Sequence, residues 1–127
     1  MTTLPNSRRG LGTAGEAHAR RYLEHQGYRF LTANWRCPSG ELDLVMNDGA
    51  EVVAVEVKTR RGEAAGRAEE AISVSQRRRL LASAEAFVAS HPEWHQAIWR
   101  IDLVAITLAP SGAVVRLLHL ANAVTTD

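Results

Sequence analysis

Three residues have the types and the spacing to act together on a substrate. Glu56 and Lys58 lie two positions apart in a valine-rich segment that predicts a β-strand, so both side chains project from the same face. Asp43 lies in the preceding predicted strand, and the Asn-Asp-Gly turn at 47–49 joins the two segments as a hairpin. We expect antiparallel pairing to bring Asp43 within about one or two pairing positions of Glu56.

The chemistry that this arrangement favours is hydrolysis assisted by a divalent metal ion. Two carboxylates at that separation repel each other unless a cation lies between them. Mg²⁺ or Mn²⁺ suits the position because both ions take carboxylate and water oxygens as ligands. Lys58, the only lysine among 15 basic residues, can hold a metal-bound water or stabilise charge that develops on a phosphate oxygen. The alternative is a surface Glu–Lys pair beside an unrelated aspartate.

Glu16 is a further candidate on a predicted helix. It shares one stripe of that helix with Ala19 and Leu23, and a carboxylate that faces a sheet needs a partner. A metal ion or a metal-bound water would provide one. Alternatively, Thr13 is the N-cap of the helix and Glu16 completes a capping box, which needs no metal. The sequence leaves both interpretations open.

Gln76 has a comparable position on a second predicted helix. It falls between Ile72 and Leu80 on the apolar stripe. An inward-facing amide can orient a water or a phosphate, and it can equally satisfy a buried backbone group.

Arginines around these residues are candidates for phosphate contacts. Arg60 and Arg61 directly follow the strand that carries Glu56, and Arg36 precedes the first predicted hairpin turn. The run 77–79 is also basic, but most of it is expected to face solvent. Net charge is only +1, so the charge balance does not by itself indicate a nucleic-acid-binding protein.

The elements that must position these residues follow from periodicity and turn signals. Residues 1–11 are interpreted as a flexible arm, 12–124 as a single domain and 61–66 as a mobile loop. The order along the chain is α-β-β-β-α-β-β, which predicts an α/β fold with a mixed sheet of about five strands, the third and fourth parallel. The predicted helices span 13–26 and 67–90, and the predicted strands span 28–36, 41–46, 51–60, 98–108 and 114–119.

Composition narrows the class of protein. The 127 residues are 46% apolar, enough for one buried core without disulfides, and Cys37 is the single cysteine. No apolar run has the length of a membrane helix and no signal-peptide core follows the N-terminus, so we expect a cytoplasmic protein without a membrane partner. Arg100 and Asp102 lie on one face of the fourth strand and are expected to form a structural ion pair.

Several short segments, taken in order, resemble those of a known family. They are Gly15-Glu16, Asn34-Trp35-Arg36-Cys37, Gly40-Glu41-Leu42-Asp43-Leu44 and Val55-Glu56-Val57-Lys58-Thr59-Arg60. Together they resemble the YraN-like bacterial proteins, within the PD-(D/E)xK nuclease superfamily, which includes type II restriction enzymes and archaeal Holliday-junction resolvases. The resemblance covers roughly residues 10 to 123.

The resemblance implies a restriction-endonuclease-like fold and a Mg²⁺- or Mn²⁺-dependent endonuclease that hydrolyses DNA, including structure-selective, resolvase-like cleavage. Asp43 and Glu56 match the metal-binding acids, and Lys58 matches the catalytic lysine. Glu16 matches the helix-one glutamate of the resolvase-like branch. Cleavage of two strands would favour a homodimer.

Two residues depart from the family pattern, and Gln76, together with the near-neutral net charge, leaves a second hypothesis open. Leu42 replaces the proline of the motif, and Gln76 stands where many relatives carry lysine. The alternative is a non-catalytic nucleic-acid-binding or protein-interaction module, in DNA repair or uptake, that retains the ancestral site.

Overall fold

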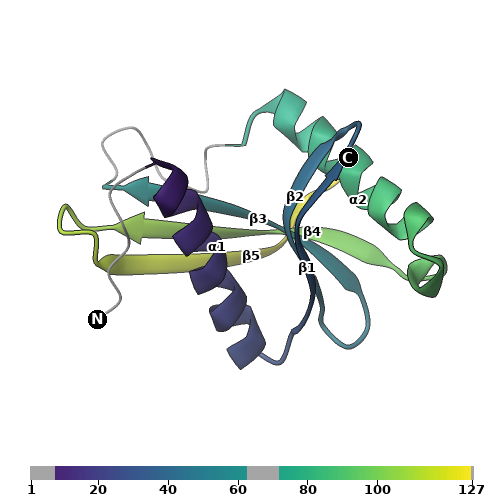
Figure 1. Cartoon of the computed structure of the whole chain (residues 1–127), viewed down its shortest axis with the longest axis horizontal. Coiled ribbons are helices and arrows are strands. Elements are labelled where there is room, and N and C mark those ends of the chain that lie inside the picture. Colours follow the sequence, from purple (N-terminus) through teal and green to yellow (C-terminus); the bar gives the residue numbers. More distant parts are fainter. Residues whose placement is uncertain (1–7, 63–71, 127) are drawn as a thin grey trace.

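Five strands with alternating side chains form a single mixed sheet, and one helix packs on each of its faces (Figure 1). The computed structural model describes residues 8–62 and 72–126. The strands are β1 (Arg29–Cys37), β2 (Gly40–Asn47), β3 (Val52–Arg61), β4 (Trp99–Leu108) and β5 (Val114–Val124). The helices are α1 (Arg8–His25), α2 (Val74–Ser90) and the short 3-10 helix η2 (Pro92–Trp94).

The strands lie in the sheet in their chain order, β1-β2-β3-β4-β5. Neighbours pair antiparallel except β3 and β4, which are parallel and are connected through α2 and η2. The predicted α/β class, the five strands and the parallel third and fourth strands are therefore confirmed. A parallel pair needs a crossover connection, which explains why the long helix lies between these two strands in the chain.

Alternation along β3 assigns its side chains to two separate cores. Val53 and Val55 pack toward α1, and Val52 and Ala54 pack toward α2. The next even-numbered side chain, that of Glu56, therefore projects on the α2 side. The buried residues of the α1 core are Ala19, Leu23, Leu44, Met46, Val53, Val55, Val104, Ile106 and Leu108.

Helix α1 begins earlier than the sequence predicts. It starts at Arg8 instead of Thr13, so residues 8–11, expected in the arm, are helical. Thr13 is therefore inside the helix and is not its N-cap, and the capping-box interpretation of Glu16 is wrong. The apolar stripe is as predicted, since Ala19 and Leu23 are fully buried. Residues 1–7 of the expected arm lie outside the described residues.

Helix α2 begins later than predicted. Ser73 is its N-cap, and the Ser73 Oγ accepts the backbone N–H of Gln76 at 3.1 Å, so the helix starts at Val74 and not near residue 67. It ends at Ser90, as the His91-Pro92 signal predicts. Residues 63–71, which include most of the expected loop, lie outside the described residues. Neither α1 nor α2 has the length and apolar character that a membrane-spanning helix requires.

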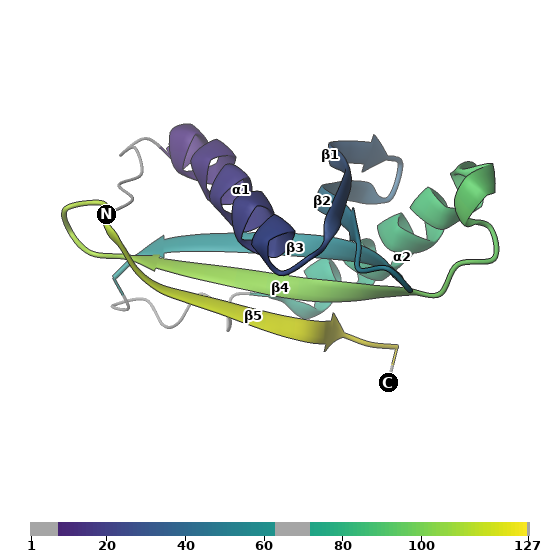
Figure 2. The ribbon, with the colours of Figure 1, turned by 90° about the horizontal axis from the view of Figure 1, so that it is seen from below.

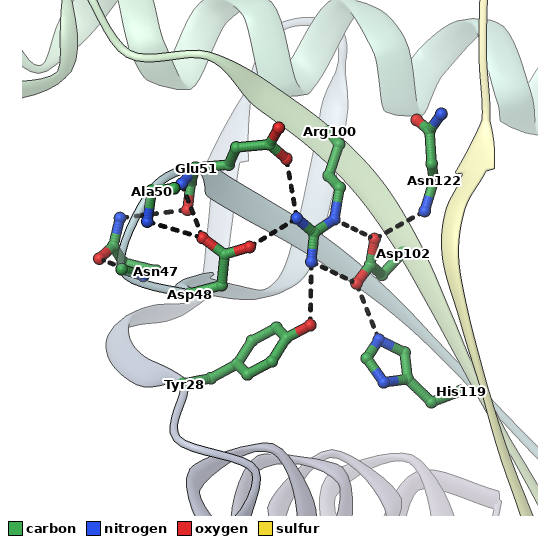
Figure 3. A network of polar contacts seen from close by, with 10 residues as sticks. Tyr28, Asn47, Asp48, Ala50, Glu51, Arg100, Asp102, His119 and Asn122 are labelled. Carbon is green, nitrogen blue, oxygen red and sulfur yellow. Dashed lines mark hydrogen bonds and ion pairs between the residues drawn. The ribbon is translucent and has the colours of Figure 1, made fainter.

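A half-buried guanidinium joins the β2–β3 turn to β4 (Figure 3). Arg100 Nη1 lies 2.6 Å from Asp48 Oδ2 and 2.7 Å from Glu51 Oε2, and Arg100 Nε donates to Asp102 Oδ1 at 2.9 Å. Arg100 Nη2 also donates to the hydroxyl of Tyr28 at 2.9 Å. The expected Arg100–Asp102 ion pair is confirmed, and it belongs to a larger network.

The same network includes two residues of β5. Asp102 is fully buried, and its carboxylate accepts the Nε2 of His119 at 2.8 Å and the backbone N–H of Asn122 at 2.8 Å. Asn122 has a φ of 53° at a shift in the β4–β5 register. These contacts help to explain why β5 continues to Val124, five residues beyond its predicted end.

Candidate active site

The strands β2 and β3 separate at the position of Asp43. Their Cα pairing runs from Asn47–Val52 to Leu44–Val55 and ends there, so Asp43 would be the next residue opposite Glu56. Beyond this point a side chain replaces the backbone carbonyl as hydrogen-bond acceptor, since Asp43 Oδ2 accepts the N–H of Val57 at 2.9 Å. Figure 2 shows the β1–β2 hairpin rising away from β3. The predicted proximity of Asp43 and Glu56 is therefore confirmed.

Glu56 is buried beside two donors. Its side chain is 7% exposed, and its Oε2 accepts the Nε2 of Gln76 at 2.6 Å and lies 3.3 Å from the Nζ of Lys58. The β3 alternation places Glu56 and Lys58 on one face as predicted, and α2 brings Gln76 to them across the crossover. Gln76 therefore contacts a carboxylate, and the expectation that it satisfies a buried backbone group is not met.

Burial and charge make ionisation of Glu56 costly. Desolvation is the largest cause and the negative charge of Asp43 adds to it, so the pKa of Glu56 is raised from 4.5 to about 8. Lys58 opposes this shift but does not cancel it. A carboxyl pair in this state gains free energy when a cation binds between the two groups.

Glu16 lies on α1, on the face of the sheet opposite to α2, within range of the Asp43 charge. Burial, followed by the charge of Asp43, raises the pKa of Glu16 to about 7. The amide nitrogen of Asn34, oriented toward the two acceptors that face it, donates to Glu16 Oε1 at 3.0 Å and to Glu41 Oε1 at 3.1 Å. Asp43 thus raises the pKa of two acids: Glu16, which lies on α1, and Glu56, which projects toward α2.

The acids Asp43 and Glu56 line a cavity of about 220 Å³ between the start of β2 and α2. Gly40, Glu41, Gln76, Arg79 and Leu80 complete its lining. The lining of the cavity is polar enough to hold ions, because it combines three carboxyl groups, one amide and one guanidinium.

The donor set fits a divalent ion that keeps some of its waters. Among the residues that the structure describes, no group of three or more His, Cys, Asp or Glu side chains is arranged to hold a metal. Mg²⁺ is commonly held by one or two carboxylates together with water and substrate phosphates, and Asp43 and Glu56 match that requirement. A structural metal cage is not present in this part of the chain.

The three candidate arginines, Arg36, Arg60 and Arg61, do not line the cavity that contains Asp43 and Glu56. Arg61 Nη1 donates to the carbonyl oxygens of Ala109 at 3.4 Å and Pro110 at 2.9 Å, so it contacts the β4–β5 turn. The Arg36 side chain is 81% exposed and lies 3.6 Å from Glu41. Arg60 follows Lys58 on the same face of β3 by alternation and is half-buried.

Sequence reasoning missed Asn34, Glu41 and Arg79 as members of the site. Asn34 has a φ of 53°, a left-handed conformation that asparagine tolerates better than most residues. A left-handed asparagine within a strand has no periodic signature, and only the fold brings it between Glu16 and Glu41. Arg79 was one of three consecutive arginines, and the exact start of the helix was needed to tell them apart.

The residues of the site fall within one family match. A model of the family described as "Uncharacterised protein family UPF0102" matches residues 15–106. The chain belongs to this family. A UPF0102 protein of Roseiflexus castenholzii is 43% identical over 121 residues, which cover 95% of this chain and 98% of the relative. A UPF0102 protein of Renibacterium salmoninarum is 46% identical over 110 residues, covering 87% and 92%.

A third relative, from Stutzerimonas stutzeri, is 46% identical over 102 residues, which cover 80% of this chain and 84% of the relative. These relatives share nearly the whole chain with this member of UPF0102. Their names give the family and no activity.

Proposed function

We propose that this protein is a Mg²⁺- or Mn²⁺-dependent nuclease that hydrolyses phosphodiester bonds in DNA. One observation carries the proposal: Asp43 and the buried Glu56 meet in one cavity where β2 and β3 separate, with Lys58 Nζ 3.3 Å from Glu56. Two carboxyls and a lysine at a strand divergence form a compact set for binding a divalent ion and stabilising negative charge on a phosphate.

Each residue has a distinct task in this proposal. Asp43 and Glu56 would hold the ion, which when bound supplies an activated water and neutralises phosphate charge. Lys58 stabilises the charge that develops on the phosphate oxygen. Gln76 fixes the Glu56 carboxylate through its 2.6 Å hydrogen bond. Glu16 accepts or releases a proton near neutral pH, because its pKa is raised to about 7.

The proposal extends to the superfamily. A four-part pattern, with a helix-one glutamate, an aspartate on β2 and a Glu-x-Lys on β3 followed by a crossover helix, is what the resemblance to PD-(D/E)xK nucleases implies. The mixed sheet with Asp43 and Glu56 at a strand divergence supports this placement. A cytoplasmic location and a homodimer that cuts two strands belong to the same proposal.

A second candidate is nucleic-acid binding without cleavage. It is favoured by the contacts of Glu56, whose Oε2 accepts the Nε2 of Gln76 and lies 3.3 Å from the Nζ of Lys58. A carboxyl group satisfied in this way is stable as an internal polar cluster. The two candidates differ in whether a divalent ion displaces these contacts.

Calorimetric titration with Mn²⁺ tests the metal site first. Wild-type protein should bind the ion, and the Asp43→Asn, Glu56→Gln double variant should not, while its circular dichroism spectrum stays unchanged. Replacing carboxylates by amides keeps size and hydrogen bonding, so a loss of binding reports charge and not folding.

Cleavage of labelled duplex, single-stranded and four-way-junction DNA tests the reaction. In Mn²⁺ the wild type should cut at least one of these, and Lys58→Met should lose cleavage by about 10²-fold or more while it still binds Mn²⁺. Full activity in Lys58→Met would refute the assigned site. Binding of DNA without cleavage of any of the three would favour the second candidate.

A further inference from the structure

Three consecutive arginines on α2 differ in what they face. Gln76 and Leu80 line the cavity with Asp43 and Glu56, and Arg79 lines it with them. On a helix of 3.6 residues per turn, Arg79 lies about 60° around the axis from Gln76, whereas Arg78 lies about 160° away. Arg77 and Arg78 are exposed and do not line this cavity.

Arg79 lies close to the backbone of Gly40. A Cβ added at Gly40 would lie 3.7 Å from the Cβ of Arg79, 4.0 Å from its Cδ and 3.4 Å from Ser83 Oγ. The aliphatic stem of Arg79 therefore passes directly over the backbone where β2 begins. Gly40 also has a φ of 148°, which suits a glycine at this turn.

The guanidinium of Arg79 is not engaged by the acids around it. Within residues 8–62 and 72–126, no hydrogen bond or ion pair is formed by Arg79, although Glu41 and Glu56 line the same cavity. Each of these acids has other partners: Glu41 is contacted by Asn34 and Arg36, and Glu56 by Gln76 and Lys58. An exposed guanidinium that has no partner among the described residues, at the edge of an acidic cavity, is available to an anion.

The charge of the cavity lining indicates how the Arg79 guanidinium would favour the approach of an anion. The cavity lining carries three carboxyl groups and one guanidinium. A divalent ion would make that lining neutral when all three carboxyls are ionised, and without the arginine it would still carry one negative charge. Lys58, whose Nζ lies 3.3 Å from Glu56, is the other cation beside these acids, so Arg79 adds a second positive charge, on the α2 side, where a phosphate would approach Asp43 and Glu56.

We propose that Arg79 binds a backbone phosphate of the nucleic-acid substrate at the mouth of the Asp43–Glu56 cavity, and that Arg77 and Arg78 do not. Guanidinium groups bind phosphate through two parallel hydrogen bonds, which fixes the strand as well as attracting it. The contact is to the backbone, so it positions a strand without reading its sequence. This inference rests on the proposed nuclease function and adds a substrate-binding residue to it.

The test compares Arg79→Ala with Arg78→Ala in the full-length protein. Fluorescence anisotropy with a labelled DNA duplex and a labelled single strand, in Mn²⁺ and in chelator, gives the dissociation constant at several salt concentrations. Arg79→Ala should weaken binding about tenfold and lower the slope of log Kd against log salt by about one. Arg78→Ala should change the affinity less than about twofold. Arg79→Lys should keep the salt slope and recover only part of the affinity.

Three outcomes would overturn the inference: no DNA binding by the wild type, unchanged affinity in Arg79→Ala, or equal weakening in Arg78→Ala. Both side chains are exposed, so thermal melting should confirm that neither variant loses its fold. The same samples are assayed for cleavage in Mn²⁺. If the wild type binds DNA and depends on Arg79 but cuts nothing, the nuclease function fails while the phosphate contact stands. If the wild type cuts DNA and Arg79→Ala matches Arg78→Ala, only the phosphate contact fails.

Discussion

Asp43 Oδ2 accepts the backbone N–H of Val57 at 2.9 Å, just beyond Leu44–Val55, the last Cα pair of β2 and β3. The Asp43 carboxylate thus accepts the hydrogen bond that a backbone carbonyl of β2 accepts in the preceding pairs of the sheet. The contact leaves the strands free to diverge and keeps the donor of Val57 satisfied. It also holds the Asp43 charge close enough to Glu56 to raise the pKa of that acid.

Asp43→Asn and Asp43→Ala should therefore have different effects. An asparagine oxygen can still accept the Val57 N–H, so Asp43→Asn should keep the stability of the wild type and lower the pKa of both Glu16 and Glu56. Asp43→Ala leaves that donor without a partner and should lose about 1–3 kcal/mol. Urea unfolding and carboxyl carbon NMR titration measure the two effects. Equal stability of the two variants would contradict the role of the hydrogen bond.

Glu56→Gln should stabilise the metal-free protein at alkaline pH. The pKa of Glu56 is about 8 in the folded state against an ordinary 4.5, so the folded state binds more protons between these values. Stability in chelator should fall as pH rises through that window. The glutamine variant lacks this titration and should exceed the wild type by roughly 0.5–2 kcal/mol at pH 8. The pKa of Glu16, about 7, leaves a smaller fall in both proteins.

The matched measurement is urea unfolding at pH 5 and at pH 8, in chelator and in Mn²⁺. At pH 5 the wild-type Glu56 is protonated and the two proteins should differ little. Added Mn²⁺ should stabilise the wild type at pH 8 and not the variant, because the ion binds the ionised carboxyl groups. A wild type whose stability does not fall with pH would contradict the raised pKa.

Gly15→Ala should destabilise the protein although it removes a helical glycine. A Cβ at Gly15 would collide with Thr59 Oγ1, where α1 packs on β3. Overpacking of this kind costs about 1–3 kcal/mol, which exceeds the gain in helix propensity of roughly 1 kcal/mol. Gly12→Ala is the control, because nothing lies within 4 Å of its added Cβ, and it should be neutral or stabilising. The double variant Gly15→Ala, Thr59→Ala should recover most of the loss.

Asn34→Gly should separate the backbone role of Asn34 from its amide role. Glycine adopts a φ of 53° without strain, so the fold should remain as stable as the wild type, whereas Asn34→Ala should lose about 1–2 kcal/mol. Both variants lose the hydrogen bond that lowers the pKa of Glu16, which should rise above about 7. NMR titration of the Glu16 carboxyl gives this pKa. An unchanged value in Asn34→Gly would show that the amide does not act on Glu16.

Arg100→Met should weaken the fold strongly and alter its response to acid. Removal of one partner from a buried ion cluster costs about 3–5 kcal/mol, and Asp102 would be left without its guanidinium. Arg100 contacts contribute to a pKa of about 2 for Asp48 and to a lowered pKa for Asp102. The contribution of these two acids to wild-type stability should therefore be complete above about pH 4 and be lost as pH falls toward 2, and this loss should be smaller in Arg100→Met. Urea unfolding across this range, with the exposed Arg78→Met as control, gives both quantities.

The parts that follow local rules were predictable from the sequence. Valine alternation in β3 and the Asn-Asp-Gly turn were enough to place Asp43 beside Glu56 and to put Lys58 on the same face. A long segment between two strands was enough to predict their parallel pairing. These features depend on side-chain period and chain connectivity, which act over few residues.

The parts that depend on tertiary contacts were not predictable. The Thr13 and Glu16 spacing satisfied a capping pattern, yet α1 continues to Arg8. The start of α2 at Val74, after the N-cap Ser73, helps to determine which of three arginines meets the cavity, and residue patterns place helix starts only to within a few positions. Asn34 joins α1 to β2 through its amide, and no spacing in the chain encodes that approach.

The Arg100 cluster and the Asp43–Val57 contact hold the two ends of the same hairpin by different means. At the turn, a guanidinium joins Asp48 and Glu51 to β4, so amide protons near Val52 and Val53 should exchange with solvent only when the whole molecule unfolds. The amide of Val57 is held by one side chain and should exchange through local opening. Among the β3 amides that face β2, exchange rates should therefore increase from the turn toward Val57, so the end of the hairpin beside the cavity can open without any slip in the pairing of β2 with β3.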